Sequence, residues 1–410
     1  MNIWIFNHYA VDPNSSGGTR HYDLAYELTK RGHKVTIIAS SFNHFMKKEK
    51  IRYGKGTFVA KESINGVNYL WIKTKKYNGS VKRIVNILDY SWKAYKASKK
   101  EINTNKPDII IGSTVHPLAS YIGYLVSKKY KIIYYFEERD LWPQTFVDFG
   151  KISSNNLVTK VLYKFEKMLY DKAKRVIVLF AKAPDYVISK GVDKSKVIYL
   201  PNGVNLNNYQ DIQADSKISE VTQQYKYKVV YTGSHGTANN LDPLIETANI
   251  LQNKLGNKDI QFILVGNGLL KGKLIEQAKS YNLKNVTFLD SIPKNKIPFL
   301  LSQADLSFVS LKESPLYKWG FSMNKLFDYM ASGLPIMMYA SKEIAGDFKD
   351  IFGVDLSQSS DELANNILLR INDETYKKKV NHSLKEYVRN NYSWKKLAFD
   401  LESYMERDIK

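Results

Sequence analysis

Short apolar runs alternate with amphipathic stretches along the first half of the chain, which is the pattern of strands that alternate with helices. The helical stretches are TRHYDLAYELTKRG (19–32), with Leu24 and Leu28 one turn apart, and the segment near 117–129. The predicted strands are NIWIFNHY (2–9), HKVTIIAS (33–40), DIIIGS (108–113), KIIYYFE (131–137), RVIVLFA (175–181) and KVIYLPNG (196–203). This order predicts a parallel sheet with helices on both faces.

The second half repeats the pattern. Its predicted strands are YKVVYTGS (227–234), IQFILVGNG (260–268), NVTFLDSI (285–292) and DLSFVSL (305–311), and its predicted helices are LDPLIETANILQNKLG (241–256), KGKLIEQAKSYNL (271–283) and the end of PKNKIPFLLSQA (293–304). The stretch GFSMNKLFDYMASGLPI (320–336) then predicts a loop, a helix that ends at Gly333 before Pro335, and a short buried strand from Ile336.

The expected fold class is therefore α/β, with two doubly wound Rossmann-like domains. We expect a first domain over residues 1–205, a second over 206–390 and a C-terminal helix over 391–410, with the polar stretch 203–225 joining the domains. Ligands of open α/β sheets lie beyond the carboxyl ends of the strands, so a cleft between the two domains is the expected site.

The two halves of the chain also differ in net charge. Residues 1–200 carry 35 Lys and Arg against 16 Asp and Glu, a net +19, whereas residues 201–410 carry 26 against 24, a net +2. The basic half suggests an anionic partner such as a membrane face, a lipid phosphate or a nucleic acid; the alternative is a solvated lysine-rich surface. The chain has no cysteine, which excludes disulfides and thiolate chemistry. No apolar run predicts a membrane span or a signal peptide, so a cytoplasmic location is expected.

Three strand-to-loop junctions in the second half carry candidate chemistry. Lys325 and Asp328 lie in the first turn of the helix in 320–336, where a cation and a carboxylate suit a phosphate beside a sugar hydroxyl. Glycine loops after two strands offer backbone N–H groups to a diphosphate, and Lys271 can reach a phosphate. The alternative for Lys325 and Asp328 is an exposed charged helix turn. The candidate ligand-binding residues of this half are Gly233, Ser234, Gly236, Gly266, Gly268, Lys271, Ser322, Asn324, Lys325 and Asp328.

The first half supplies three further stretches. SSGGTRH (15–21) follows the first strand, and its Gly17 and Gly18 allow close approach of a phosphate or sugar; a plain flexible turn is the alternative. His116 ends a strand, where a structural role is the alternative to catalysis. FEERDLWP (136–143) places four charged residues at a strand end, where they either pair with one another or orient an acceptor. The candidate ligand-binding residues among these side chains are Arg20, His21, Glu138, Arg139 and Asp140.

In this order, the motifs GGTRH, RDLWP, PNGV (201–204), VGNG and NKLFDYMASGLPI resemble the retaining glycosyltransferases of family 4, which have the GT-B fold. The resemblance covers essentially the whole chain and is closest to the bacterial subgroup that contains L-fucosamine transferases of O-antigen and capsule assembly. It includes the tail, which resembles the C-terminal helix that crosses back onto the first domain. The chain departs from the family pattern at Gly320, where the first of two glutamates is missing, and in GSHGTANNLD, which lacks an Arg and a Lys for the diphosphate.

The resemblance implies an acceptor-binding first domain and a nucleotide-sugar-binding second domain. It makes Gly17, Gly18 and the candidate residues of the second half donor-binding, and it makes Arg20, His21, Glu138, Arg139 and Asp140 acceptor-binding. It implies transfer of an N-acetylhexosamine, such as N-acetyl-L-fucosamine, from a UDP-sugar to a lipid-linked saccharide, without a metal or a cofactor. His116, Lys325 and Asp328 become the candidate catalytic residues, with Lys325, Lys271 and backbone amides neutralising the diphosphate in place of the missing pair.

The basic, aromatic segment 82–100 predicts a helix that lies on an anionic membrane, or an ordinary surface helix. We therefore expect a protein at the inner face of the cytoplasmic membrane. Three alternatives remain: a UDP-sugar 2-epimerase of the same architecture, a non-catalytic member of a polysaccharide assembly complex, and a nucleic-acid-binding protein, which gives no reason for the glycine loops.

Overall fold

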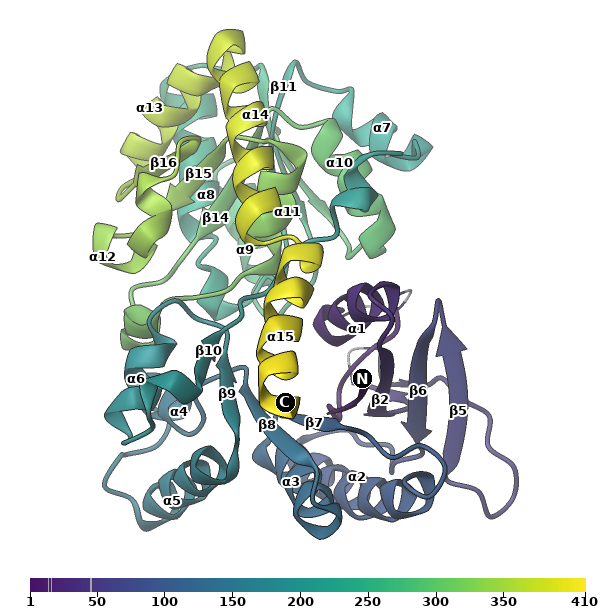
Figure 1. The fold of residues 1–410 in the computed structure, drawn as a ribbon. Helices are drawn as coiled ribbons and strands as arrows, with labels where there is room; N and C mark the ends of the chain where they lie inside the picture. Colours follow the sequence, from purple (N-terminus) through teal and green to yellow (C-terminus); the bar gives the residue numbers. More distant parts are fainter. Residues whose placement is uncertain (14, 16, 45) are drawn as a thin grey trace. The chain divides into compact units, whose positions relative to one another are not determined.

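The protein, seen in a computed structural model that describes residues 1–13, 15, 17–44 and 46–410, forms two compact units. Unit 1 contains Met1–Asn202 and Trp394–Lys410, and unit 2 contains Gly203–Ser393. Each unit has its own parallel sheet with helices on both faces (Figure 1). The α/β class predicted from the pattern is confirmed.

Among the described residues, unit 1 has an eight-stranded sheet in the order β10-β9-β8-β7-β1-β2-β6-β5. The pairs are parallel except for β5, which runs antiparallel to β6. The strands are β1 (Asn2–Phe6), β2 (Lys34–Ser40), β5 (Val59–Ile64), β6 (Val67–Ile72), β7 (Ile109–Ser113), β8 (Ile133–Glu138), β9 (Arg175–Val178) and β10 (Val197–Tyr199). A separate two-stranded pair joins β3 (Phe42–Asn43) and β4 (Lys48–Glu49).

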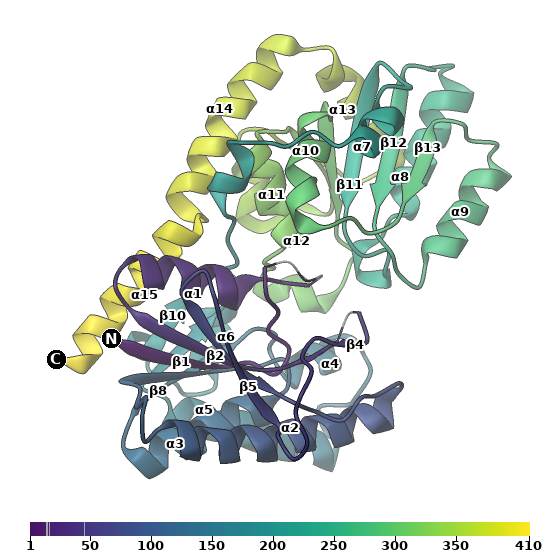
Figure 2. The same cartoon turned by 90° about the vertical axis from the view of Figure 1, so that its right-hand side faces the viewer.

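Helices cover both faces of this sheet. α1 (Arg20–Lys30) and α15 (Trp394–Ile409) lie on one face, and α2 (Ser80–Glu101), α3 (Pro117–Tyr130) and α5 (Leu157–Lys172) lie on the other (Figure 2). Two shorter helices, α4 (Gln144–Asp148) and α6 (Ala183–Ser189), complete the unit. The apolar residues of α15 recur once per turn and are buried against α1 and the sheet: Trp394, Leu397, Leu401 and Met405.

Among its described residues, unit 2 has a six-stranded parallel sheet in the order β13-β12-β11-β14-β15-β16. The strands are β11 (Tyr227–Thr232), β12 (Ile260–Val265), β13 (Val286–Leu289), β14 (Leu306–Ser310), β15 (Ile336–Tyr339) and β16 (Val354–Ser357). The helices are α7 (Ser216–Thr222), α8 (Asp242–Asn249), α9 (Lys271–Ser280), α10 (Ile297–Ser302), α11 (Asn324–Ser332), α12 (Lys342–Ala345), α13 (Ser360–Ile371) and α14 (Glu374–Asn391).

Separate apolar cores lie on the two faces of the second sheet. One includes residues of α10, α11 and α14, and the other includes residues of α8, α9 and α13. α11 ends where the sequence predicts, because Gly333 takes the left-handed conformation with φ of 73°. A Cβ on Gly333 would also lie 2.3 Å from the Asn381 side-chain amide nitrogen, so only glycine fits.

The sequence analysis missed one hairpin and interpreted one packed stretch as a linker. The β5–β6 hairpin turns at Asn65 and Gly66, both with positive φ, and Asn-Gly is a strong hairpin signal. The stretch 203–225, interpreted as a linker, packs on unit 2 instead: Val204 donates its N–H to the Tyr392 carbonyl, and Val204 and Ile218 lie in the unit 2 core.

An acidic residue near the end of α15 fixes that helix to unit 1. Asp408 accepts two hydrogen bonds from Arg175, at 2.6 and 2.7 Å, and one from the Tyr135 hydroxyl at 2.6 Å. The Asp408 side chain is 3% exposed. We expect Asp408→Ala to lower the free energy of unfolding by about 2–3 kcal/mol, because it leaves a half-buried guanidinium without its counter-charge. Urea unfolding of the full chain measures this effect.

Asp400→Ala is the matched control, since Asp400 lies on the same helix and pairs with Lys396 at the surface. It should change the free energy by about 0.5 kcal/mol or less. Equal effects of the two substitutions would contradict the anchoring role of Asp408.

Candidate functional site

Two glycine loops interlock at the carboxyl edge of the unit 2 sheet. The Gly233 N–H donates to the Val265 carbonyl at 2.9 Å, and the His235 N–H donates to the Asn267 carbonyl at 3.0 Å. A Cβ on Gly266 would lie 1.8 Å from the Gly233 carbonyl oxygen. The structure thus brings together the predicted loop residues of both strands: Gly233, Ser234, Gly236, Gly266 and Gly268.

Gly266 is the most constrained position of these loops. Its φ of 147° and the contact with Gly233 leave no room for a side chain. We expect Gly266→Ala to cost about 3 kcal/mol of unfolding free energy, through overpacking and backbone strain. Thermal unfolding measures the loss. Gly272→Ala is the control, because Gly272 lies in α9 with nothing within 4 Å of an added Cβ. It should be neutral or slightly stabilising; a similar loss in both variants would contradict the interlocking of the loops.

Lys325 extends from the first turn of α11 to these loops. Its ammonium donates to the Tyr231 hydroxyl at 2.9 Å and to the Asn239 side-chain oxygen at 2.6 Å, and it lies 4.3 Å from the centre of the Tyr231 ring. Among the described residues, no carboxylate lies within ion-pair distance of it. Burial lowers the pKa of the Lys325 ammonium to about 7. The loops therefore hold an amine that is about half protonated at pH 7 and that lacks an anionic partner among the described residues.

Asp328 lies one turn further along α11. One of its oxygens accepts a hydrogen bond from the Tyr209 hydroxyl at 2.8 Å. Burial, followed by Asp328, raises the pKa of Tyr209 well above its ordinary value, so the phenol remains a donor. Sequence analysis missed Tyr209, which lies in the short 3₁₀ turn Leu206–Tyr209 of the predicted linker.

The other predicted donor-binding residues differ in their hydrogen-bond partners and in their exposure. Lys271 donates to the Asp290 carboxylate at 2.7 Å and to the Leu289 carbonyl at 2.9 Å, so its charge is already compensated. Ser322 and Asn324 lie at the start of α11, Ser322 half-buried and Asn324 exposed. Gly17 and Gly18 belong to unit 1, before α1, and Ser16 of the same motif lies outside the described residues.

In unit 1, two predicted acceptor-binding residues are buried in a polar network. Arg20 pairs with Glu137 at 2.9 Å and donates to the carbonyls of Leu200 and Pro201. His21 contacts the other Glu137 oxygen at 2.6 Å. Arg20 and His21 are each 3% exposed. Burial alone would raise the pKa of Glu137, but the two neighbours hold it well below its usual range. In this structure Arg20 and His21 fix α1 to the ends of β8 and β10.

The three charged residues at the carboxyl end of β8, Glu138, Arg139 and Asp140, have different surroundings. Glu138 is buried and accepts from the Tyr170 hydroxyl and the Trp142 N–H. Burial and the neighbouring Glu166 raise the pKa of Glu138 well above its ordinary value. Arg139 is half-buried, and its Nε has no hydrogen-bond partner among the described residues, whereas Asp140 is exposed. Only Arg139 and Asp140 of this set are accessible to a ligand.

His116 caps α3 and contacts a second histidine. Its Nδ1 accepts from the Ala119 N–H at 3.3 Å, and its Nε2 lies 2.7 Å from Nδ1 of His8. Burial, with Arg83 nearby, lowers the pKa of His116 to about 3, so the ring is neutral at pH 7. Because Nδ1 accepts a hydrogen bond, Nε2 carries the proton of the neutral ring and donates a hydrogen bond to Nδ1 of His8. Both His116 nitrogens are thus engaged; His8, which follows β1 in NIWIFNHY, was not singled out from the sequence.

The described residues contain no group of three or more histidine, aspartate or glutamate side chains that could hold a metal ion. None of the helices in the described ranges is long and apolar enough to cross a membrane.

Two family models match the chain, and each covers most of one unit. Residues 17–208 match the model described as Glycosyltransferase Family 4, and residues 213–391 match the one described as Glycosyl transferases group 1. Both models describe glycosyltransferases and together they span most of the chain, so the chain belongs to the glycosyltransferases. The match over residues 17–208 supports family 4, which its motifs predict.

Individual relatives are distant. The Escherichia coli K12 protein WcaI, whose name assigns it provisionally as a colanic acid biosynthesis glycosyl transferase, is 26% identical over 160 residues, which are 38% of each chain. The match thus spans well under two thirds of this curated relative. The sucrose-phosphate synthase of Thermosynechococcus elongatus has a TM-score of 0.72 at 18% identity, covering 99% of this chain and 98% of that one. Anabaena HepE, solved with UDP-glucose, has a TM-score of 0.67 at 16% identity, covering 99% and 100%. These structures confirm the GT-B fold.

Proposed function

We propose that the protein is a retaining glycosyltransferase. In this proposal it moves an N-acetylhexosamine, such as N-acetyl-L-fucosamine, from a UDP-sugar to a lipid-linked saccharide of O-antigen or capsular polysaccharide. The observation that carries the proposal is Lys325, which has no carboxylate partner in the described part of the chain and lies beside two interlocked glycine loops. A nucleoside diphosphate supplies the negative charge that these loops lack.

The proposed donor site lies at the carboxyl edge of the unit 2 sheet. Lys325 binds the diphosphate, the glycine loops approach it through their backbone, and Asp328 accepts from the ribose hydroxyls beside the Tyr209 hydroxyl. HepE supports the uridine nucleotide, because its structure holds UDP-glucose in the same fold. The choice of an N-acetylhexosamine rests on the resemblance of the NKLFDYMASGLPI stretch to L-fucosamine transferases.

The proposed reaction breaks the bond between the anomeric carbon and the UDP β-phosphate oxygen. The same carbon forms a bond to an acceptor hydroxyl oxygen, and the acceptor proton passes to the departing phosphate. The products are the glycosylated acceptor and UDP. Charge develops on the leaving diphosphate, so a cation at Lys325 favours the transition state over the ground state. The reaction as proposed needs no metal and no side-chain nucleophile, in accord with the resemblance.

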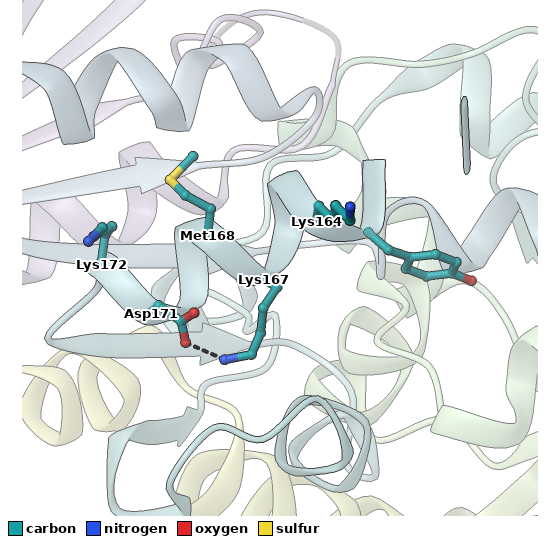
Figure 3. Close-up of a pocket in the computed structure, with 6 residues that line it drawn as sticks. Lys164, Lys167, Met168, Asp171 and Lys172 are labelled. Carbon is teal, nitrogen blue, oxygen red and sulfur yellow. Dashed lines mark hydrogen bonds and ion pairs between the residues drawn. The ribbon is translucent and has the colours of Figure 1, made fainter. Parts of the chain in front are cut away.

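We further propose that the helical face of unit 1 formed by α2 and α5 lies on an anionic membrane. Five apolar side chains of α2 are exposed: Val81, Ile84, Val85, Leu88 and Trp92. The basic residues of the helix lie at both ends of this stretch, at 82–83 and 93–100. On α5, Leu157, Val158 and Val161 are exposed as well. A shallow hollow of about 480 Å³ beside α5 is lined by three lysines, of which Lys167 pairs with Asp171 (Figure 3). Exposed apolar and cationic side chains together suit the interface of an anionic bilayer.

A UDP-release assay tests the proposal. A panel of nucleotide sugars that includes UDP-N-acetyl-L-fucosamine is incubated with the full chain, with and without membrane lipid extract, and with and without a chelator. We expect release from one UDP-hexosamine that depends on the lipid extract and ignores the chelator. Interconversion of a UDP-sugar without UDP release would favour the 2-epimerase, and no change in any donor would favour the non-catalytic alternative.

A further inference from the structure

A second site, in unit 1, holds two cations that have no carboxylate partner among the described residues. The Arg83 cluster consists of Tyr9, His44, Lys47, Tyr77 and Arg83. The Arg83 guanidinium donates to the Tyr9 hydroxyl at 3.2 Å and lies 5.4 Å from the centre of that ring. The Lys47 ammonium lies 4.5 Å from the centre of the Tyr77 ring and 3.4 Å from Nδ1 of His44, which also contacts the Tyr77 hydroxyl. Aromatic faces hold both cations in place.

The charge of this cluster is not compensated within the part of the chain that the structure describes. Neither Arg83 nor Lys47 has a carboxylate within ion-pair distance, whereas Lys50 nearby pairs with both Asp12 and Glu62. The two cations act on their surroundings: burial, then Lys47 and Arg83, lower the pKa of His44 to about 4. A positive site beside a neutral histidine and two phenols can accept an anion without first breaking an ion pair.

The position of the cluster narrows the choice of anion. Tyr9 follows β1, so the cluster lies near the carboxyl edge of the sheet, where ligands of α/β folds bind. Arg83 belongs to the first turns of α2, and the exposed apolar side chains of that helix begin at Val81 and Ile84 on either side of it. A phosphate on the cluster would therefore have an apolar surface beside it, which matches a phosphate that carries a lipid chain.

We propose that Arg83 and Lys47 bind the diphosphate that joins the acceptor saccharide to its lipid. This inference rests on the proposed transferase function and adds the acceptor's anionic group and the residues that hold it. Tyr9 and Tyr77 position the two cations, and the apolar stripe of α2 faces the lipid. The acceptor is thus a lipid-linked diphosphate rather than a free sugar phosphate.

Vesicle binding of the full chain tests the inference. The probes are phosphatidylcholine vesicles that carry polyprenyl diphosphate, vesicles of the same total charge made with phosphatidylglycerol, and phosphatidylcholine alone. We expect the wild-type protein to bind polyprenyl diphosphate vesicles about tenfold or more tightly than charge-matched vesicles, since charge-assisted hydrogen bonds to a phosphate exceed general attraction. Inorganic pyrophosphate should compete.

The decisive comparison removes the same number of cations at two places. Arg83→Ala with Lys47→Ala should abolish the preference for polyprenyl diphosphate. Lys96→Ala with Lys99→Ala is the matched control, because these lysines lie on α2 over Trp92 and Tyr95 with no link to the cluster, and it should keep the preference. Equal loss of the preference in both double variants would overturn the inference, as would no preference in the wild-type protein. Competition by a soluble sugar phosphate as strong as that by inorganic pyrophosphate would overturn it too.

The outcome is separable from the proposed function. UDP release that depends on lipid extract, together with no vesicle preference, would refute this site and leave the transferase intact. A preference that depends on Arg83, with no release from any donor, would support the site and refute the transferase. UDP affinity in Arg83→Ala should equal that of the wild-type protein, since the cluster takes no part in donor binding.

Discussion

Lys325→Met should lower the acceptor-dependent rate of UDP release by about 10²–10³-fold, because it removes an ammonium group at the predicted diphosphate site that has no carboxylate partner among the described residues. Methionine keeps the unbranched side chain, so packing against Tyr231 and the α11 turn changes little. Steady-state rates at saturating donor measure the loss, and the midpoint of thermal unfolding checks that the variant is folded.

Lys273→Met is the matched control for this substitution. Lys273 also lies in unit 2, but it is exposed and pairs with Asp242 at 3.3 Å. Its replacement should leave the rate within about twofold of wild type, since surface pairs contribute little. If Lys325→Met retained the wild-type rate, or if both variants lost activity equally, the proposed leaving-group role of Lys325 would be wrong.

The second large effect concerns a buried histidine and acid pH. His235 is 0% exposed, and neither ring nitrogen has a hydrogen-bond partner among the described residues. Burial, followed by Lys271 and Lys325, lowers the pKa of His235 to about 4. The unfolded chain has a histidine pKa near 6.5, so it binds the proton first as pH falls. Stability is therefore kept above about pH 6.5 and is lost as pH falls from 6.5 towards 4.

His235→Leu should remove this loss. At one pKa unit per about 1.4 kcal/mol, the variant should gain about 3 kcal/mol over wild type when pH falls from 7 to 4. Urea unfolding at a series of pH values measures the difference. His382→Leu is the control, because His382 is 87% exposed on α14, and its curve should run parallel to wild type. A parallel curve for His235→Leu would contradict the assignment of an unpartnered, neutral imidazole.

Patterns local in sequence predicted the framework of both units. The apolar runs gave the strands of two parallel sheets, and Gly333 with Pro335 ended α11 where expected. The β5–β6 hairpin was missed although Asn65-Gly66 marks it. The glycine loops were predicted as separate motifs; their interlocking depends on parallel β11 and β12 ending side by side, which the sequence implies only through topology.

Side-chain roles were harder to predict than elements, because they depend on partners far away in the chain. Arg20 and His21 belong to a motif that suggests a ligand. In the structure both side chains instead contact the carboxylate of Glu137, which lies more than 100 residues away in the sequence. The Arg83 cluster consists of residues from three separate loops and a helix. Their spacing in the sequence does not predict that they lie close together. The L-fucosamine subgroup and the acceptor remain predictions that rest on motif resemblance and charge.

Binding of UDP to the full chain at pH 8, measured by calorimetry in two buffers of different ionisation enthalpy, tests the central claim most directly. Lys325 is mostly neutral at that pH, because burial lowers its pKa to about 7, and the diphosphate must restore its charge. The account predicts binding with uptake of about one proton in the wild-type protein, and weaker binding without uptake in Lys325→Met. No binding of UDP, or equal binding without proton uptake in both proteins, would contradict the assignment of Lys325 and the glycine loops as the diphosphate site.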